Sequence, residues 1–324
     1  MKYILLPQSV GIRRLSFYLA MEEYVARHIE ENDCFFTWQV EPSVIFGRNQ
    51  LIEAEVNLEF CRRHHIQMFR RKSGGGCVYA DMSNLMFSYI TSEESVNFTF
   101  NRYVMMVVYL LQKLGIDARS SGRNDILVGD RKVSGSAFYH LPGRSIVHST
   151  MLYDTDMQNM VGAITPTDEK LLSKGVQSVR QRICLLKDCI RLTLPEFRQY
   201  VHDTLCEGDI MLDEDDVRAV EVLEQTYLSP EFIYGNNPRY TVVRHGRIDG
   251  VGELEARIEL KNGIIRSINL VGDYFLTGEL DSQLLDKLKG LPLEREALSR
   301  RLPDRIDDIV MNLSKEDFIR LLTQ

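Results

Sequence analysis

The sequence predicts a mixed α/β protein of the α+β type, with a larger N-terminal domain and a smaller α+β C-terminal domain. Three observations predict this fold class. Over the first 240 residues, short runs rich in aromatic and β-branched residues alternate with helical runs. The length of 324 residues exceeds the about 250–300 residues beyond which a single core usually divides. The stretch SPEFIYGNNPR, after Leu228, concentrates Pro, Gly and Asn as a connection between domains does.

The N-terminal elements follow from the spacing of apolar residues and from the residues that end each run. Leu15–Ile29 places apolar side chains near one face at helical spacing, which predicts an amphipathic helix. Asn97–Leu114 ends at Gly115, a usual residue after a helix, and predicts another. The expected strands are short and are bounded by Pro or Gly or by the turn Gly129-Asp130: Phe35–Val40, Ser43–Phe46, Gln67–Arg71, Ile126–Val128, Arg131–Val133 and Ser136–Tyr139.

We place the domain boundary near Tyr240, which gives domains of residues 1–240 and 241–324. Beyond the boundary, Gly252–Ile258 and Ile264–Leu270 flank the turn Lys261-Asn262-Gly263 and predict a hairpin. The rest is predicted to be helical, on the apolar positions of residues 281–289 and 315–322. A unit of about 80 residues can fold independently.

Composition excludes several classes of protein. With 46 acidic and 39 basic residues the net charge is -7, so a general nucleic-acid-binding surface is not expected. An apolar fraction of 44% argues against disorder, and no apolar run approaches a membrane span or a signal-peptide core. The six cysteines contain no C-x-x-C pair, so neither a zinc site nor a disulfide framework is indicated. We therefore expect a cytoplasmic protein that binds no membrane.

RRKSGGGCVYADMSNLMFS, residues 70–88, is the first of four segments that suggest chemistry. Each glycine inside a strand-rich region costs about 0.5–1 kcal/mol relative to Ala, so close approach of the backbone to a ligand explains three in a row better than packing does. Successive N–H groups without Cβ atoms can converge on an anionic oxygen beside positive side chains. The residues concerned are Gly74, Gly75, Gly76, Arg70 and Arg71. A hairpin turn with basic flanks is the alternative, since the segment matches neither the P-loop nor the dinucleotide fingerprint.

The second segment is SGRNDILVGDRKVSGSAFYH, residues 121–140. Lys132 lies between two polar segments that contain glycine, where its ammonium can act as a point charge on a transferring phosphoryl group. A solvated surface lysine is the alternative. Asp125 is a candidate magnesium ligand, although an Asp that caps a turn is the commoner case.

The third and fourth segments are VHSTMLYD, residues 147–154, and LLSKGVQSVRQRICLL, residues 171–186. His148 is a candidate ligand-binding residue, but its residue type alone favours a hydrogen-bonded structural histidine. Lys174, Arg180 and Arg182 form a basic cluster in an acidic protein, for which a solvated helix face is a fair alternative.

Taken in this order, the segments resemble the lipoate-protein ligase A family. Its pattern has an early G-R-N-Q, then R-R-x-S-G-G-G-x-V-[FY]-x-D-x-x-N, G-R-N-D-[LI]-x-V, R-K-[IV]-S-G-S-A, an H-x-[ST] strand and K-G-[IV]-x-S-V-R-x-R. This chain has Gly47-Arg48-Asn49-Gln50 and each later element at compatible spacing. The motifs cover about residues 10 to 190, and several linked motifs are far more specific than any one of them.

The resemblance implies a mixed-sheet, biotin/lipoate ligase-like catalytic domain followed by a lipoate ligase C-terminal accessory domain. It implies a reaction in which lipoate attacks the α-phosphate of ATP to give lipoyl-AMP, and a carrier lysine then attacks the acyl carbon and releases AMP. ATP and magnesium would be required, with lipoate as substrate. The carriers would be the lipoyl domains of 2-oxoacid dehydrogenase E2 subunits and the glycine cleavage H protein.

The resemblance also implies roles for single residues. Lys132 would be the catalytic residue and would touch both the α-phosphate and the lipoyl carbonyl oxygen. His148 would line the lipoyl or adenylate pocket, and Asp125 would assist magnesium. The nucleotide would be bound by Arg70, Gly75, Gly76, Cys77 and Val78, with support from Ser73, Gly74, Asn84 and Arg180.

One departure from the family pattern keeps alternatives open. Cys77 stands where the ligases usually have Ala, so an octanoyl or lipoyl transferase that works through a cysteine thioester is a second hypothesis. The related transferases carry their cysteine elsewhere, in regions that here contain none, and Cys77 is most simply a substitute for Ala. A non-catalytic protein that binds lipoyl groups or nucleotide is a third hypothesis. A biotin ligase is disfavoured because its G-R-G-R-x-G type loop is absent.

Overall fold

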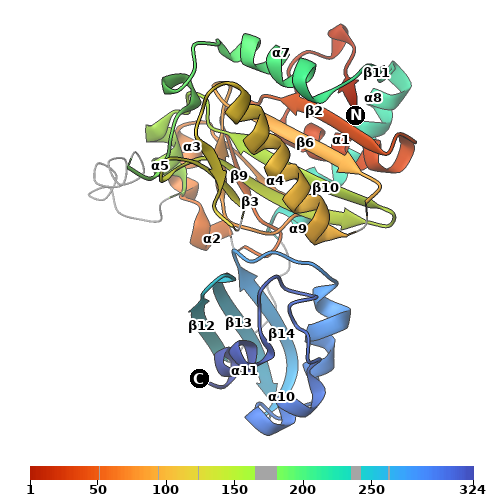
Figure 1. The fold of residues 1–324 in the computed structure, drawn as a ribbon. Coiled ribbons are helices and arrows are strands. Elements are labelled where there is room, and N and C mark those ends of the chain that lie inside the picture. Colours follow the sequence, from red (N-terminus) through yellow and green to blue (C-terminus); the bar gives the residue numbers. More distant parts are fainter. Residues whose placement is uncertain (51, 94, 123, 165–180, 235–241, 262) are drawn as a thin grey trace. The chain divides into compact units, whose positions relative to one another are not determined.

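The computed structural model describes residues 1–50, 52–93, 95–122, 124–164, 181–234, 242–261 and 263–324 (Figure 1). The chain forms two compact units. The first contains residues 1–45, 55–71 and 78–233, and the second contains residues 46–54, 72–77 and 234–324. The predicted boundary near Tyr240 lies outside the described residues. Two short segments from the N-terminal half therefore cluster with the C-terminal residues: residues 46–54, and residues 72–77, which contain the three glycines and are called the glycine segment below.

A mixed sheet of eight described strands forms the first unit, in the order β11-β1-β2-β6-β10-β9-β8-β7. β1 pairs parallel with both β2 and β11, and the pairs from β2 to β7 are antiparallel, so the predicted mixed sheet is confirmed. The strands are β1 Lys2–Leu5, β2 Asp33–Trp38, β6 Leu85–Thr91, β7 Ala118–Ser120, β8 Asp125–Val128, β9 Arg131–Leu141, β10 Arg144–Met151 and β11 Asp209–Met211.

Helices cover both faces of this sheet. On β10, His148 bonds to Glu22 of α1 (Leu15–His28) and the next residue, Ser149, bonds to Tyr103 of α4 (Val96–Lys113). Because successive side chains of a strand point to opposite faces, α1 and α4 lie on opposite sides of the sheet. The other helices of this unit are η1 Gln8–Val10, α3 Leu58–Arg63, α5 Met157–Ile164, η2 Leu186–Asp188, α7 Leu194–Leu205 and α8 Glu214–Leu228; α2 Ile52–Glu55 and α9 Pro230–Tyr234 span the limits of the two units.

The predicted helix Leu15–Ile29 is confirmed by α1, but its burial is greater than an amphipathic surface helix would show. Every residue from Leu15 to Ala26 is buried, because α1 contacts strands β6 and β10 on one side and α8 on another. α8 begins with a capping box, in which Asp213 and Asp216 bond to each other's backbone N–H groups. Charged residues on α1, Glu22 and Glu23, consequently lie inside the unit.

A second, three-stranded sheet has the order β4-β3-β5, with β3 Ser43–Phe46, β4 Gln67–Arg70 and β5 Val78–Ala80. The predicted strands Ser43–Phe46 and Gln67–Arg71 are confirmed to within one residue. The glycine segment connects β4 to β5 in the chain. The sheet therefore fixes both ends of that segment.

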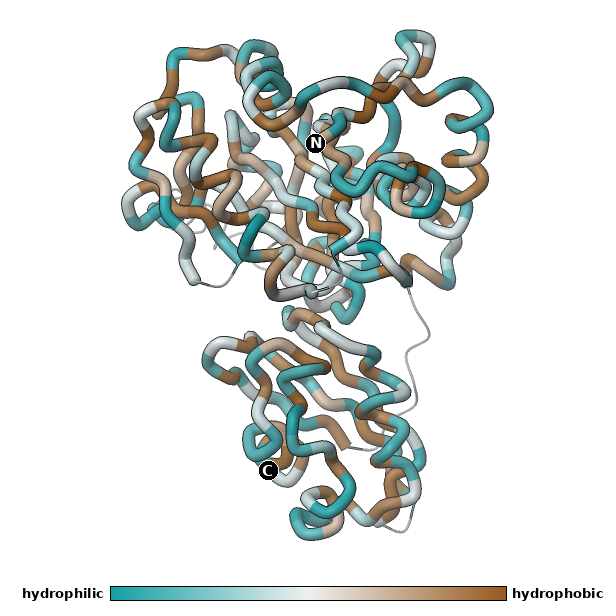
Figure 2. The backbone as a smooth tube through the Cα atoms, turned by 45° about the vertical axis from the view of Figure 1, so that its right-hand side comes forward, coloured by the Kyte–Doolittle hydropathy of each residue, from teal (hydrophilic) through white to brown (hydrophobic). Residues whose placement is uncertain are grey.

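The second unit contains an antiparallel sheet of β12 Val242–Ile248, β13 Gly252–Lys261 and β14 Ile264–Gly272. One face packs on an apolar cluster that includes Leu254, Ile258 and Phe318. α10 Arg295–Arg301 and α11 Lys315–Thr323 follow it, and Figure 2 shows brown apolar and teal polar stretches alternating along the chain in both units. The predicted β13–β14 hairpin is confirmed. The predicted helical character of residues 281–288 is also confirmed, as a π-helix, η3 Asp281–Leu285, followed by a 3-10 helix, η4 Asp286–Leu288.

One strand prediction was wrong in its extent. Arg131–Val133 and Ser136–Tyr139 belong to a single strand, β9, which continues through Ser134-Gly135 because both residues pair with β10. The pairing of β9 with β8 has a register shift between Ile126 and Leu127. Within the described residues, every helix is too short or too polar to span a bilayer.

A histidine that links α7 to β11 should make the free energy of unfolding depend on pH near neutrality. His202 lies 2.8 Å from Asp203 and 2.9 Å from Asp209, and the hydrogen bond to Asp203 is the main reason why the pKa of His202 is raised. A raised pKa means that this stabilisation is full below the unfolded value of about 6.5 and is lost as pH rises through the folded pKa. We expect the free energy of unfolding, measured by urea titration, to fall as the pH rises from about 6 to about 8.5. The fall should be larger in the wild type than in His202→Gln.

His64 is exposed, which makes His64→Gln the matched control that should keep the wild-type dependence. If the free energy of unfolding changed with pH equally in the wild type and in His202→Gln, His202 would not be the source of the pH dependence.

Candidate functional site

The glycine segment is bonded through its backbone to residues that follow β14. Gly75 N donates to Tyr274 O at 2.9 Å, and Arg48 N donates to Ser73 O at 2.9 Å. The neighbouring Asn49 O accepts from Gly272 N at 2.8 Å. All these residues belong to the second unit. Two other segments, residues 48–49 and 272–274, therefore bond through the backbone to the glycine segment and to each other.

Each of the three glycines meets a different requirement. A Cβ on Gly74 would lie 2.3 Å from Tyr274 O, so this position needs glycine for close backbone contact. Gly75 has φ +86°, in the left-handed region that favours glycine. A Cβ on Gly76 would meet nothing closer than the Asp273 side chain at 3.9 Å. Packing therefore explains Gly74 and backbone conformation explains Gly75, while neither explains Gly76.

The two arginines before the segment are buried and are oriented by backbone carbonyl groups. Arg70 Nε donates to Ile233 O at 2.9 Å, and Arg71 Nη1 donates to Ile45 O at 3.0 Å. Long cationic side chains are rarely buried unless their charge is compensated, so burial of both argues for a defined role.

Lys132 and Asp125 form an ion pair between β9 and β8. Lys132 Nζ lies 2.8 Å from Asp125 Oδ1, and the lysine side chain is 38% exposed. Asp125 pairs across the strands with Gly135, and a Cβ on Gly135 would lie 2.6 Å from Lys132 Nζ. The ammonium therefore occupies the space that the missing side chain of Gly135 leaves. Asp125 orients an ammonium that solvent or a ligand can still reach.

Two serines on the same strand contribute unsatisfied polar atoms. Ser134 Oγ and Ser136 Oγ are buried, and neither has a hydrogen-bond partner among the described residues. Asn124 bonds to both backbone groups of Ser136, at 2.8 and 3.2 Å, and so fixes this part of β9 to the segment before β8. Buried hydroxyl groups usually have partners, so these two are available for a ligand or an ordered water.

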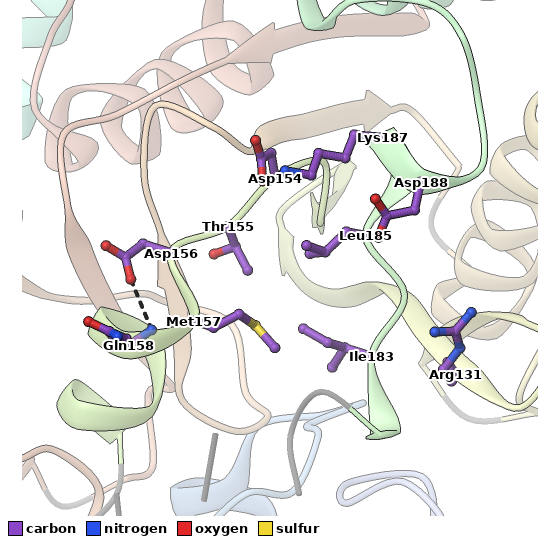
Figure 3. A pocket seen from close by; sticks show the side chains of 10 residues that line it. All are labelled: Arg131, Asp154, Thr155, Asp156, Met157, Gln158, Ile183, Leu185, Lys187 and Asp188. Carbon is purple, nitrogen blue, oxygen red and sulfur yellow. Dashed lines mark hydrogen bonds and ion pairs between the residues drawn. The ribbon is translucent and has the colours of Figure 1, made fainter. Parts of the chain in front are cut away.

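The backbone of Lys132 is bonded to the segment that includes Ile183 and Cys184. Cys184 N donates to Lys132 O at 2.7 Å, and Ile183 forms a parallel bridge with Lys132. The same segment lines a pocket of about 610 Å³, in which an ion pair joins Lys187 to Asp154 (Figure 3). Arg131, the residue before Lys132, also lines this pocket. The pocket therefore adjoins the strand that carries the candidate catalytic lysine.

His148 takes part in a buried polar network. His148 Nδ1 lies 3.0 and 3.1 Å from the two carboxylate oxygens of Glu22, which is 0% exposed. Ser88 Oγ donates to Glu22 at 2.6 Å and accepts from Trp38 Nε1 at 2.8 Å. A carboxylate can only accept, so Nδ1 of His148 carries the hydrogen and the tautomer is fixed.

Sequence reasoning missed Glu22. The available signal was a pair of acidic residues, Glu22-Glu23, inside the otherwise apolar run LSFYLAM and YVA. A buried carboxylate needs donors, and Glu22 obtains them from His148 and Ser88, while Glu23 pairs with Arg27 and Tyr227.

The other predicted site residues differ in their burial and in their bonds, and some lie outside the described residues. Cys77 is half-buried, and Val78 begins β5. Asn84 bonds to Thr155 Oγ1 at 3.0 Å and to Tyr153 N at 3.2 Å, so its side chain connects the start of β6 to the segment after β10. Arg180 and Lys174 lie outside the described residues, and Arg182 is exposed.

A resident metal centre made only of protein ligands does not occur in the described part of the chain, which contains no group of three or more His, Cys, Asp or Glu suited to a metal. Asp125 is a single carboxylate beside a lysine. Magnesium is commonly bound by one or two carboxylates together with substrate phosphates, so this donor set fits an ion that arrives with a nucleotide.

Comparison with known proteins identifies two family models. The lipoyl protein ligase A/B catalytic domain matches residues 15–206, and the bacterial lipoate protein ligase C-terminus matches residues 237–322. Lipoate-protein ligase LplJ of Bacillus subtilis is 32% identical over 97% of this chain and 98% of its own. Lipoate–protein ligase 1 of Staphylococcus aureus is 33% identical over 87% of this chain and 89% of its own.

Solved structures show the same fold. LipL1 of P. falciparum, in complex with lipoate, has a TM-score of 0.76 at 21% identity and covers 100% of this chain and 98% of its own. The bi-partite lipoate protein ligase of Thermoplasma acidophilum, described with its E2 lipoyl domain, has a TM-score of 0.65 at 26% identity. It covers 74% of this chain and 98% of its own.

The contact between Gly74 and Tyr274 predicts a difference between neighbouring glycines. Gly74→Ala should destabilise the protein by about 1–3 kcal/mol, because its Cβ would clash with a backbone oxygen that cannot rotate away. Gly76→Ala is the matched control and should leave the free energy of unfolding nearly unchanged, since its Cβ meets only ordinary contact. Urea titration of both variants measures the difference. Equal stabilities would show that the glycine segment is not packed against Tyr274.

Proposed function

Because this chain belongs to the lipoate-protein ligase family, and is thus an enzyme of the ligase class, we propose that it converts lipoate to lipoyl-AMP and transfers the lipoyl group to a lysine of lipoyl carrier domains. The observation that carries the assignment of the catalytic centre is the ammonium of Lys132, placed over Gly135 and oriented by Asp125. ATP is the activating substrate, as expected from the ligase class.

The chemistry requires activation because a carboxylate is a poor acyl donor. In the first half-reaction a carboxylate oxygen of lipoate attacks the α-phosphorus of ATP, and the bond to pyrophosphate breaks. In the second, the amine of the carrier lysine attacks the acyl carbon, AMP leaves, and the amine loses a proton. Negative charge develops on oxygen in both steps, so one well-placed cation can assist both.

Lys132 has the properties that such a cation needs. Its ammonium has three donors and is partly exposed, so it can reach a phosphate oxygen and an acyl oxygen while one donor stays on Asp125. Gly135 gives the ammonium room, and the buried hydroxyl groups of Ser134 and Ser136 offer further hydrogen bonds on the same strand. Magnesium, which would enter with the phosphates and bind Asp125, would supply additional charge neutralisation.

The glycine segment and Arg70 are proposed to bind the phosphates. A Cβ at Gly76 would meet only the Asp273 side chain, at 3.9 Å, so there is room for an anionic oxygen to approach this part of the backbone, and Arg70 adds a cation whose Nε donates to a backbone carbonyl oxygen. Cys77 and Val78 continue the same backbone and are proposed to contact the adenylate. Ser73, Gly74, Asn84 and Arg180 remain proposed supporting residues.

His148 is proposed to contact the lipoyl group. The network of Glu22 and Ser88 fixes the orientation and the tautomer of its ring, which is what a side chain that orients a substrate requires. The acceptors are proposed to be the lipoyl domains of 2-oxoacid dehydrogenase E2 subunits and the glycine cleavage H protein. The Thermoplasma relative, whose E2 lipoyl domain is named with it, supports this class of partner.

Substitutions at Lys132 and Gly135 separate catalysis from folding. Lys132→Ala should abolish pyrophosphate exchange with lipoate as the variable acid, because it removes the cation. Gly135→Ala should fold normally, since its Cβ would clash only with the flexible end of Lys132 and would meet Asp125 Oδ1 at an ordinary contact distance of 3.5 Å. It should nevertheless slow exchange by up to 10²-fold, because it displaces the ammonium by about 1 Å. Gly246→Ala is the matched control, a strand glycine whose Cβ also meets a flexible side-chain end, and should exchange normally.

Two outcomes would contradict the assignment. An unchanged rate of pyrophosphate exchange in Gly135→Ala would show that Lys132 does not belong to the catalytic centre. Binding of lipoyl-AMP by calorimetry without exchange in the wild type would favour the non-catalytic hypothesis.

The half-buried thiol of Cys77 supports one competing mechanism, acyl transfer through a thioester. We expect Cys77→Ala to change the exchange rate little, because this cysteine replaces the Ala of the ligase pattern. Lipoyl transfer to an apo carrier domain should require ATP in both proteins, with Cys61→Ala as the control for loss of a cysteine elsewhere. Loss of transfer in Cys77→Ala, together with transfer that needs no ATP, would establish the thioester mechanism instead.

A further inference from the structure

Cys184 and Cys189 are close enough to react with each other. Their Sγ atoms lie 3.1 Å apart, and each lies 3.8 Å from the backbone oxygen of Leu185. All six cysteines of the chain are described and are free thiols. Cys184 is buried, whereas Cys189 is half-buried. The pair is separated by four residues in a C-x₄-C arrangement, and in the described part of the chain it belongs to no group of three or more His, Cys, Asp or Glu suited to a metal.

Backbone hydrogen bonds bring the two thiols together. Cys184 N donates to Lys132 O at 2.7 Å and Leu186 N donates to Leu152 O at 2.8 Å, which anchors this segment to β9 and to the residue after β10. The 3-10 turn η2 then reverses the chain, and Cys189 N donates to Leu186 O at 2.9 Å. Because these bonds do not involve sulfur, the proximity of the thiols follows from the backbone itself.

We propose that Cys184 and Cys189 form a thiol–disulfide modification site whose co-reactants are low-molecular-weight disulfides. The thiolate of Cys189 attacks one sulfur of the small disulfide, whose S–S bond breaks, and one small thiolate leaves. Cys184, after losing its proton, attacks the Cys189 sulfur and releases the second small thiol. Two protein thiols become one disulfide, and one small disulfide is reduced to two thiols.

The two cysteines have different accessibility, which sets the order of these steps. Burial, and then the hydrogen bond to Cys189, raise the pKa of Cys184 to about 12, so its thiolate is scarce. Cys189 is the more exposed thiol and is therefore the point of entry. A disulfide needs an S–S distance of about 2.05 Å, so the sulfur atoms must approach by about 1 Å.

This approach has a consequence for Lys132. One of the two residues that approach each other, Cys184, is bonded through its N–H group to the carbonyl group of Lys132, and the preceding residue bridges to the same strand position. We therefore expect formation of the disulfide to strain this backbone pairing with Lys132. Because a displacement of about 1 Å at a catalytic group can cost up to 10²-fold in rate, we expect the oxidised protein to activate its substrate about tenfold more slowly. This last step rests on the proposed function.

The covalent part of the proposal is tested by mass spectrometry of the full-length protein, first reduced and then treated with oxidised glutathione. The wild type should lose two hydrogens and yield a linked Cys184–Cys189 peptide. Cys184→Ser should accumulate a mixed disulfide at Cys189, because the resolving thiol is missing, and Cys189→Ser should remain unmodified at Cys184. Cys61→Ser, a change at another buried cysteine, should behave as the wild type. No linked peptide in the wild type, or modification of Cys184 in Cys189→Ser, would overturn the proposal.

Pyrophosphate exchange tests the coupling to Lys132. The oxidised wild type should be about tenfold slower than the reduced wild type and should recover with dithiothreitol, while Cys189→Ser should be insensitive to oxidised glutathione. Equal rates for the reduced and the disulfide-linked wild type would overturn the coupling. Absence of exchange in the reduced wild type would instead contradict the ligase assignment, which the mass measurement does not involve.

Discussion

The ion pair of Lys132 and Asp125 is the constraint on which the local structure of β9 depends. An ammonium that is 38% exposed would move freely if it had no fixed partner, and the 2.8 Å contact gives it one. The contact requires that β8 and β9 pair with a shifted register and that residue 135 has no side chain. Asn124, the two buried serines and the backbone bond from Cys184 all act on the same short part of β9. The local structure is therefore organised around one positive charge.

Local pattern predicted much of the fold. The helices α1 and α4, the strands β3 and β4 and the β13–β14 hairpin follow from periodicity and turn residues that lie within each segment. The full length of β9 could not be predicted, because Ser134 and Gly135 are extended through pairing with two other strands, β8 and β10. Residues 281–288 were correctly predicted to be helical, but their division into a π-helix and a 3-10 helix could not be predicted, since apolar spacing does not distinguish these from an α-helix.

The residues of the candidate site were likewise predictable where the signal is local and not predictable where it depends on the fold. Lys132 and the glycines could be found because glycine and lysine have strong local signals, and the family pattern ordered them. Glu22 could not be assigned to His148, because the two residues lie on a helix and a strand that meet only in the folded protein. The same holds for the thiols of Cys184 and Cys189, whose contact depends on a 3-10 turn and on anchoring to β9.

The bonds that join the glycine segment to Tyr274 mean that the second unit is not a continuous piece of chain. It includes residues 46–54 and 72–77 as well as the C-terminal residues, so the order of the sequence and the order of assembly differ. A protein cut at the connection near residue 240 would leave Gly75 N without its acceptor and would expose the backbone surface that Gly74 covers. Two fragments produced separately would each lack part of a shared hydrogen-bonded surface, and each would complete the other when mixed. Complementation between fragments, rather than independent domains, is the behaviour that this architecture dictates.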